Sequence, residues 1–141
     1  MAHTPGSMVL LTRLSRLVYR RATEDVLGMR LKQFVALSHL RHLPMTQREL
    51  GDAMMVDANN AVLLLNELEA AGWAARRRDP EDRRRHIVDI TPAGAEALER
   101  AERALDGVEN AVLAGLGADE RATLRDLLER ALRSSRGPAP A

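Results

Sequence analysis

Apolar residues recur at helical spacing along most of this chain, in the i, i+3, i+4, i+7 pattern of amphipathic helices. The pattern predicts a first helix reaching about residue 26, a second over residues 31–43 and a long helix over residues 92–116. A last helix begins after Gly117. We expect the last helix to bury the leucines that recur along it, namely Leu124, Leu127, Leu128 and Leu132.

Two shorter helices are predicted in the middle of the chain. Thr46 and Glu49 have the spacing of a capping box, which indicates a helix over residues 47–54. Asp57 is a candidate N-cap for a helix over residues 58–71, and Gly72 is its candidate C-cap. Two helices joined by a tight turn outline a helix-turn-helix motif.

A β-hairpin is predicted directly after this motif. Residues 86–90 alternate between apolar and polar, residues 74–78 can pair with them, and Asp79-Pro80 favours a loop between the two strands. Six arginines face three acids between Arg76 and Arg85. Such a cluster costs stability unless a polyanion neutralises it, although a charge run can also be an ordinary solvated loop. A helix-turn-helix followed by a basic hairpin is a winged helix-turn-helix in outline.

The segment from Thr46 to Gly94 resembles the DNA-binding core of the MarR family of transcriptional regulators. The most discriminating part is the Asp-Pro-x-Asp-Arg-Arg wing at residues 79–84, followed by a strand and by Thr-Pro-x-Gly at residues 91–94. The resemblance implies a mainly α fold with a small β-hairpin wing. Its regions would be a winged helix-turn-helix over residues 31–91 and dimerisation helices over residues 8–28 and 92–133. We expect one domain over residues 8–133, with disordered ends at residues 1–7 and 134–141, which are rich in small residues, Gly and Pro.

The resemblance also implies a function. MarR-like proteins are sequence-specific DNA-binding regulators, and we expect a ligand-responsive repressor that binds double-stranded DNA as a homodimer on a pseudo-palindromic operator. The apolar stripes at both ends of the chain favour a dimer over a self-contained helical monomer. Two other interpretations stay open. One is a winged helix that serves as a protein-interaction or nonspecific DNA-binding module, and the other is a small-molecule-binding protein with incidental DNA affinity.

Expected DNA contacts on the two helices come from their starts and from one outer face. Gln47 and Arg48 resemble positions that touch the DNA backbone. On the second helix, asparagine side chains can bond adenine edges or phosphates, and Leu63 can touch a thymine methyl group. Relatives commonly have threonine at position 62 and arginine at position 63, so Val62 and Leu63 depart from the family pattern. The alternative is that Leu63 packs inside the protein while the asparagines only cap the helix. The outer face comprises Asn59, Asn60, Leu63, Asn66 and Glu67.

The wing should supply the remaining contacts. Arg83 and Arg84 at its tip are expected to enter the minor groove, whose negative potential attracts guanidinium groups. We expect Asp82 to hold one of them through a bidentate pair. The other wing arginines alternate along the strands, so that some contact phosphates and others cover the hairpin. They are Arg76, Arg77, Arg78 and Arg85.

An effector site is suggested by the resemblance alone, since MarR-like proteins often bind small aromatic or phenolic ligands beside their dimerisation helices. Aromatic residues and methionines at helical spacing are more often core residues than pocket residues. His39 and His42 could share a metal, but no Cys, Asp or Glu lies near them in the sequence, which favours two ordinary histidines. We expect no metal and no cofactor. The candidate pocket residues are Tyr19, Met29, Phe34, His39 and Trp73.

Composition narrows the function classes further. The 141 residues suit one domain, and with 45% hydrophobic but only 2% aromatic residues the core must be aliphatic and helical. The formal net charge is only +1, so the basic charge is local. The chain has no cysteine, which excludes disulfides and thiol redox sensing, and it has no phosphate-binding loop or nucleophile elbow, so we expect no enzyme. We expect a soluble cytoplasmic protein because no membrane span or leader pattern is evident.

Overall fold

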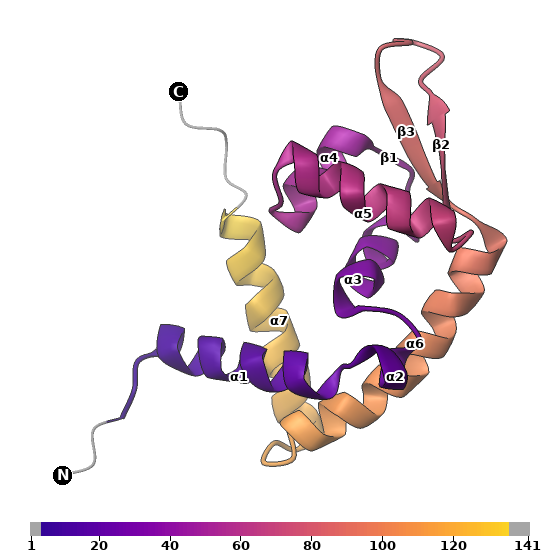
Figure 1. Ribbon diagram of the computed structural model, residues 1–141. Helices are drawn as coiled ribbons and strands as arrows, with labels where there is room; N and C mark the ends of the chain where they lie inside the picture. Colours follow the sequence, from indigo (N-terminus) through magenta and orange to yellow (C-terminus); the bar gives the residue numbers. More distant parts are fainter. Residues whose placement is uncertain (1–3, 136–141) are drawn as a thin grey trace.

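The computed structural model describes residues 4–135 and shows a mainly helical fold with a small antiparallel sheet (Figure 1). This confirms the predicted fold class. None of the helices in the described part of the chain is long and apolar enough to cross a membrane. In chain order the elements are α1 (Ser7–Arg21), α2 (Glu24–Leu27), α3 (Leu31–Leu40), β1 (Met45–Thr46), α4 (Gln47–Met54), α5 (Ala58–Ala70), β2 (Ala74–Arg78), β3 (His86–Ile90), α6 (Pro92–Val112) and α7 (Ala118–Ser135).

Side-chain hydrogen bonds cap the N-termini of both helices of the helix-turn-helix, α4 and α5. At α4 the Thr46 hydroxyl accepts from the Glu49 N–H and the Glu49 carboxylate accepts from the Thr46 N–H, each over 3.0 Å. At α5 the Asp57 carboxylate accepts from the Asn60 N–H over 2.8 Å. These bonds satisfy N–H groups that the first helical turn leaves unpaired. The capping box and the N-cap predicted from the sequence are therefore confirmed.

The sheet has the strand order β1-β3-β2. The predicted hairpin pairing is confirmed, with Ala74 opposite Ile90 and Arg78 opposite His86. The sequence did not predict β1, whose Met45 pairs with Val88 on the other side of β3. Its two residues are too few to show the alternation by which a strand is recognised.

The core lies where α3, α5 and α6 meet the sheet. Thr91 anchors α6 to the base of the hairpin, because its hydroxyl donates to the Gly72 carbonyl over 2.6 Å and accepts from the Gly94 N–H over 3.0 Å. These two hydrogen bonds tie the start of α6 to the base of the hairpin, which projects from the helical part of the molecule (Figure 1). The largest fully enclosed side chains are aliphatic, as expected, apart from Met29, and include Leu37, Leu40, Leu65, Leu68, Val88 and Leu98.

Three helix boundaries differ from the predictions. The first helix breaks at Ala22, where the backbone turns to φ −87° and ψ 61°, and α2 then packs against α6 as a separate short helix. The helix α3 ends at Leu40 and not at residue 43, because Pro44 disfavours a helical conformation in the residue before it. The helix α6 ends at Val112 and not at residue 116. There the Arg121 guanidinium donates to the carbonyl groups of Leu113 and Leu116, which satisfies acceptors at the helix end.

The ends of the described chain also correct the predictions. The helix α1 begins at Ser7 and α7 continues to Ser135, so residues 7, 134 and 135 are helical and do not belong to disordered ends. The rest of the expected C-terminal tail and residues 1–3 lie outside the described residues. The helix α7 buries none of its residues within this chain, since Leu127 is 52% and Leu132 is 50% exposed. Within the single chain α7 has few neighbours (Figure 1), so the expected burial of these leucines would require the second subunit that the apolar stripes suggested.

Candidate nucleic-acid interface

The outer face of α5 is exposed to solvent along its length. Its inner face packs Leu64, Leu65 and Leu68 into the core. Leu63 points the other way and is 51% exposed, so it does not pack inside this chain. The asparagines on the same face, Asn59, Asn60 and Asn66, are also exposed. The structure thus presents one apolar and three carboxamide side chains on a single helix face beside the hairpin.

Arg76 lies on β2 where this strand meets α4 and α5, and its guanidinium contacts side chains of both helices. It forms an ion pair with Glu69. It also donates to the Gln47 Oε1 atom over 3.3 Å and to the Asn66 Oδ1 atom over 3.0 Å. Three of its five N–H bonds are thus directed at protein groups, which is the arrangement expected of a wing arginine that covers the hairpin.

Two other wing arginines are likewise bonded along the hairpin. The Arg77 Nε donates to the Asp89 carboxylate over 2.8 Å, and the Arg78 Nη1 donates to the Arg83 carbonyl oxygen over 3.2 Å. The Arg85 Nε lies 4.0 Å from the Asp79 carboxylate. These three side chains brace the wing, and their guanidinium groups still leave donors for a neighbouring molecule because each has five N–H bonds.

The wing tip is shaped by two aspartates. Asp79 is largely buried and its carboxylate accepts from the Glu81 N–H over 2.9 Å, which holds the turn that begins at Asp79-Pro80. The Asp82 Oδ1 atom accepts from both the main-chain N–H of Arg84, over 3.1 Å, and its Nε, over 3.3 Å. The expected bidentate pair is wrong, because both donors converge on one carboxylate oxygen. Asp82 nevertheless sets the direction of Arg84, whose side chain is 92% exposed.

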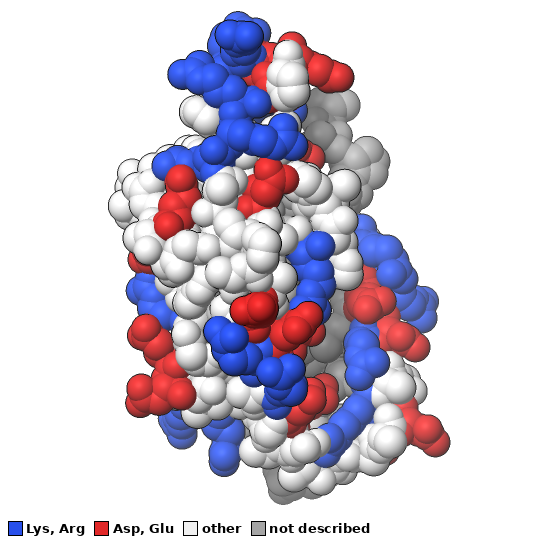
Figure 2. Space-filling model, turned by 90° about the vertical axis from the view of Figure 1, so that its right-hand side faces the viewer, with Lys and Arg blue, Asp and Glu red and all other residues white. Residues whose placement is uncertain are grey.

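The start of α4 and the wing form one continuous surface. A cleft of about 470 Å³ between them is lined by Gln47 and Arg48 from α4 and by Arg84 and Arg85 from the wing, together with the acidic Glu49 and Asp52 of α4. Figure 2 shows that Lys and Arg gather at the wing, whereas both signs of charge are mixed over the rest of this face. Residues that are far apart in the sequence therefore line one cleft, and the basic charge is concentrated on its wing side.

Sequence reasoning missed the partner of Glu67. Arg30, just before α3, forms an ion pair with the Glu67 carboxylate, and the Gln33 Nε2 donates to the same group over 3.5 Å. The hydrogen bond and the charge of Glu67 raise the pKa of Arg30. This pair neutralises the acidic group at the edge of the α5 outer face. Nothing in the local sequence indicated it, because the two residues are 37 positions apart.

Three of the five candidate pocket residues belong to the hydrophobic core rather than to a cavity. Met29 and Phe34 are buried in the core, Trp73 packs against that core, and Tyr19 is 68% exposed on α1. His39 lies half-buried on α3. Among the described residues no group of three or more His, Asp or Glu side chains could hold a metal ion.

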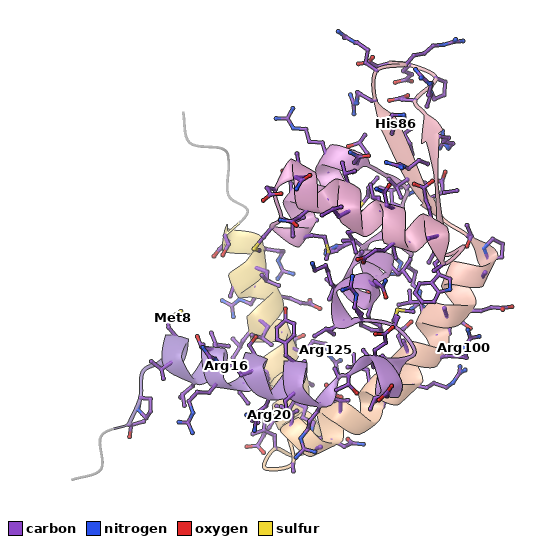
Figure 3. All side chains as sticks on the ribbon, in the orientation of Figure 1. Met8, Arg16, Arg20, His86, Arg100 and Arg125 are labelled. Carbon is purple, nitrogen blue, oxygen red and sulfur yellow. The ribbon has the colours of Figure 1, made fainter. Side chains whose placement is uncertain are left out.

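A cavity of about 360 Å³ lies instead between α1, α6 and α7, and none of those five residues lines it. Its lining is almost entirely aliphatic and includes Leu11, Leu14, Val18, Val108 and Leu124. The apolar stripes of the terminal helices were the sequence signal that could have located it. Figure 3 shows the outer end of α1 at Met8, far from the wing that carries His86.

Comparisons with known proteins agree with this architecture. The MarR family model matches residues 27–85. A transcriptional regulatory protein named for the hcr operon of Thauera aromatica is 40% identical over 89 residues, which cover 63% of this chain but only 54% of that protein. The multiple antibiotic resistance protein MarR of Escherichia coli is 31% identical over 102 residues, which cover 71% of each chain.

The fold agrees as well. A crystal structure of an E. coli MarR variant in complex with operator DNA superposes with a TM-score of 0.69 at 28% identity and covers 89% of both chains. The length shared with the hcr regulator is little more than half of that relative, whereas the E. coli protein is matched over more than two thirds of its length. With the family model, the sequence similarity and the winged helix-turn-helix in agreement, the chain belongs to the MarR family.

Proposed function

We propose that this protein is a sequence-specific DNA-binding transcriptional repressor that acts as a homodimer on a pseudo-palindromic operator. One observation carries the proposal: the start of α4 and the arginine-rich wing line one cleft, and Arg76 joins both to the exposed face of α5. A helix that presents short polar side chains outward can enter the major groove, and a basic wing beside it can follow the backbone or the minor groove. Operator DNA bound to a structurally similar MarR variant supports this assignment.

The wing tip would supply the groove contact. Arg83 has no side-chain ion pair to a described residue, and Arg84 is directed outward by Asp82. Gln47 and Arg48 would contact the phosphate backbone from the cleft beside the wing. In this arrangement residues 31–91 are the DNA-binding region.

A second copy of the chain would cover the terminal helices. Large apolar side chains on α1 and α7 are exposed in the single chain, among them Met8 at 69%, Val9 at 52% and Leu127 at 52%. Exposed apolar surface of this extent marks an interface. We therefore assign residues 8–28 and 92–133 to dimerisation, which places two copies of α5 on one duplex.

The apolar cavity between α1, α6 and α7 is the candidate effector site. At about 360 Å³ and with an almost entirely aliphatic lining, it suits a small apolar or aromatic molecule. Because its walls are the proposed dimerisation helices, a bound ligand would change the distance between the two α5 helices and hence the affinity for the operator.

Selection of duplexes from a random pool tests the proposal. The purified protein should enrich one inverted repeat whose half-sites lie about one helical turn apart, with two chains bound per duplex in sedimentation. Enrichment of no sequence, with equal affinity for all duplexes, would reject the repressor. It would instead favour a nonspecific DNA-binding or protein-interaction module.

A further inference from the structure

Three side-chain amides of the candidate interface have fixed orientations. An amide accepts hydrogen bonds at its oxygen and donates them at its nitrogen. A carboxylate can only accept and a guanidinium can only donate. A charged partner therefore fixes the direction of an amide and uses one N–H bond or one lone pair of the end that it contacts, while the opposite end stays unengaged.

Asp57 fixes the amide of Asn60. One carboxylate oxygen of Asp57 accepts from the Asn60 main-chain N–H over 2.8 Å, and the other accepts from the Asn60 side-chain Nδ2 over 3.1 Å. Because Asp57 holds both the backbone and the amide nitrogen, the carbonyl oxygen of Asn60 is left unengaged at the exposed start of α5.

Arg76 fixes the other two amides in the opposite sense. Its guanidinium donates to the Oε1 atom of Gln47 on α4 and to the Oδ1 atom of Asn66 on α5, while Glu69 balances its charge. Both amides thus use their oxygen inside the protein. Their NH₂ groups form no hydrogen bond to a described residue, and Asn66 is exposed while Gln47 is half-buried.

We propose that Asp57 and Arg76 are positioning residues that preset opposite hydrogen-bonding polarities on the DNA-facing surface. This inference rests on the proposed function. An outward carbonyl on Asn60 needs a donor, and DNA has none on its phosphates. In the major groove the donors are the amino groups of adenine and cytosine. Asn60 therefore selects adenine or cytosine over guanine and thymine, whereas the NH₂ groups of Gln47 and Asn66 bind acceptors, namely phosphate oxygens or purine N7 atoms.

The Asn60 half of the proposal is tested by base preference. The wild-type protein should bind duplexes with adenine or cytosine at one position of each half-site roughly fivefold more tightly than duplexes with guanine or thymine there. Asn60→Ala should abolish this preference. Asp57→Ser keeps a helix cap but loses the second carboxylate oxygen, so it should reduce the preference to less than about twofold while the melting temperature changes little. Full preference in either variant would overturn the role of Asp57.

The Arg76 half is tested by the salt dependence of binding. Arg76→Lys retains the charge beside Glu69 but loses the planar group that reaches both amides. We expect operator affinity to fall roughly fivefold with no change in the slope of log K against log salt. Arg83→Ala is the matched control and should make that slope shallower by about 0.9. An Arg76→Lys protein with wild-type affinity would contradict the positioning role. A shallower slope of log K against log salt for Arg76→Gln would also contradict it, because that result would indicate a lost phosphate contact.

A double variant tests the same role without placing lysine at residue 76. Gln47→Ala combined with Asn66→Ala leaves the Arg76–Glu69 pair in place and should weaken binding at least as much as Arg76→Lys. Operators with 7-deazapurines or with neutral methylphosphonates then separate purine N7 from phosphate as the acceptor.

If the wild type shows no preference among duplexes, the proposed function itself fails. If it selects an operator but Asp57 and Arg76 variants select the same one with unchanged affinity, only this inference fails.

Discussion

Gly94 lies against the main chain of Trp73, and a Cβ atom at residue 94 would overlap the Trp73 carbonyl group. The same stretch of backbone is bonded by Thr91, whose N–H donates to the Trp73 carbonyl oxygen over 3.0 Å. Glycine in the Thr-Pro-x-Gly motif thus allows the start of α6 to sit directly on the base of the hairpin. Backbone atoms cannot move aside as a flexible side chain can.

Gly94→Ala should therefore destabilise the protein by about 1–3 kcal/mol, the range for forced overpacking. Gly107→Ala is the matched control in the same helix. Its Cβ atom would meet no atom within 4 Å, and alanine should stabilise the helix by roughly 0.5–1 kcal/mol. Urea unfolding of both variants measures the difference. Equal free energies of unfolding would contradict the close approach to Trp73.

Elements whose causes are local were predictable from the sequence. The capping box at Thr46 and Glu49 and the Asp57 cap each depend on residues three positions apart, and the hairpin pairs two segments joined by one short loop. The break at Ala22 and the two-residue strand β1 were not predictable, because packing of α2 on α6 and pairing with β3 produce them. The apolar stripe of α7 was predictable as well, and the single chain leaves Leu127 and Leu132 about half exposed.

For the candidate DNA-binding site, the sequence indicated that the wing is basic but not which group each wing arginine contacts. Six arginines in one run look alike, yet the fold ties Arg76 to Gln47, 29 positions earlier, and leaves Arg84 in solvent. The Arg30–Glu67 pair arises in the same way from contact between α5 and the segment before α3. Such pairings depend on which elements meet in three dimensions, and spacing along the chain carries no signal for them.

Met55 has a left-handed backbone, with φ 57° and ψ 41°, in the turn between α4 and α5. A side chain is unfavourable in this conformation, and Met55 gains little in return because it is 74% exposed. We expect Met55→Gly to raise the free energy of unfolding by a few tenths of a kcal/mol to about 1 kcal/mol. Met8→Gly at the exposed start of α1 is the control and should not stabilise. A lower melting temperature for Met55→Gly would show that the methionine has a packing role.

The capping box should make stability depend on pH in the acid range. Hydrogen bonds from the main chain and the hydroxyl of Thr46 lower the pKa of Glu49 below its usual value of 4.5. A carboxylate with a lowered pKa in the folded state contributes stability above pH 4.5, and this contribution is lost as the pH falls through the lowered value. Glu49→Gln can keep the hydrogen bond to Thr46 without titrating. Its unfolding free energy should fall less than that of the wild type between about pH 5 and pH 3, and parallel curves would contradict the assignment.

The exposed leucines of α7 give a test of dimerisation that preserves the fold of each chain. Leu127 is 52% exposed, so Leu127→Glu should remove contacts with a second copy while leaving the helix intact. Leu43→Glu is the control, because Leu43 is 68% exposed in the segment between α3 and β1. Analytical ultracentrifugation should show a shift to monomer for Leu127→Glu alone, with unchanged far-ultraviolet circular dichroism. A fully dimeric Leu127→Glu protein would place the interface elsewhere.

Neighbouring leucines on α5 separate the surface that contacts DNA from the core. Leu63 is 51% exposed on the outer face, whereas Leu64 is 2% exposed and belongs to the core. Leu64→Ala should cost about 2–5 kcal/mol of stability because it opens a cavity. Leu63→Ala removes almost no buried surface, so its melting temperature should stay close to that of the wild type. If Leu63 contacts a thymine methyl group in the major groove, Leu63→Ala should weaken operator binding by roughly 1 kcal/mol and leave binding to random duplexes unchanged. Replacing that thymine with uracil in the operator should weaken the wild type by a similar amount and should not weaken Leu63→Ala further. Equal losses in both proteins on uracil substitution would show that another group reads the methyl.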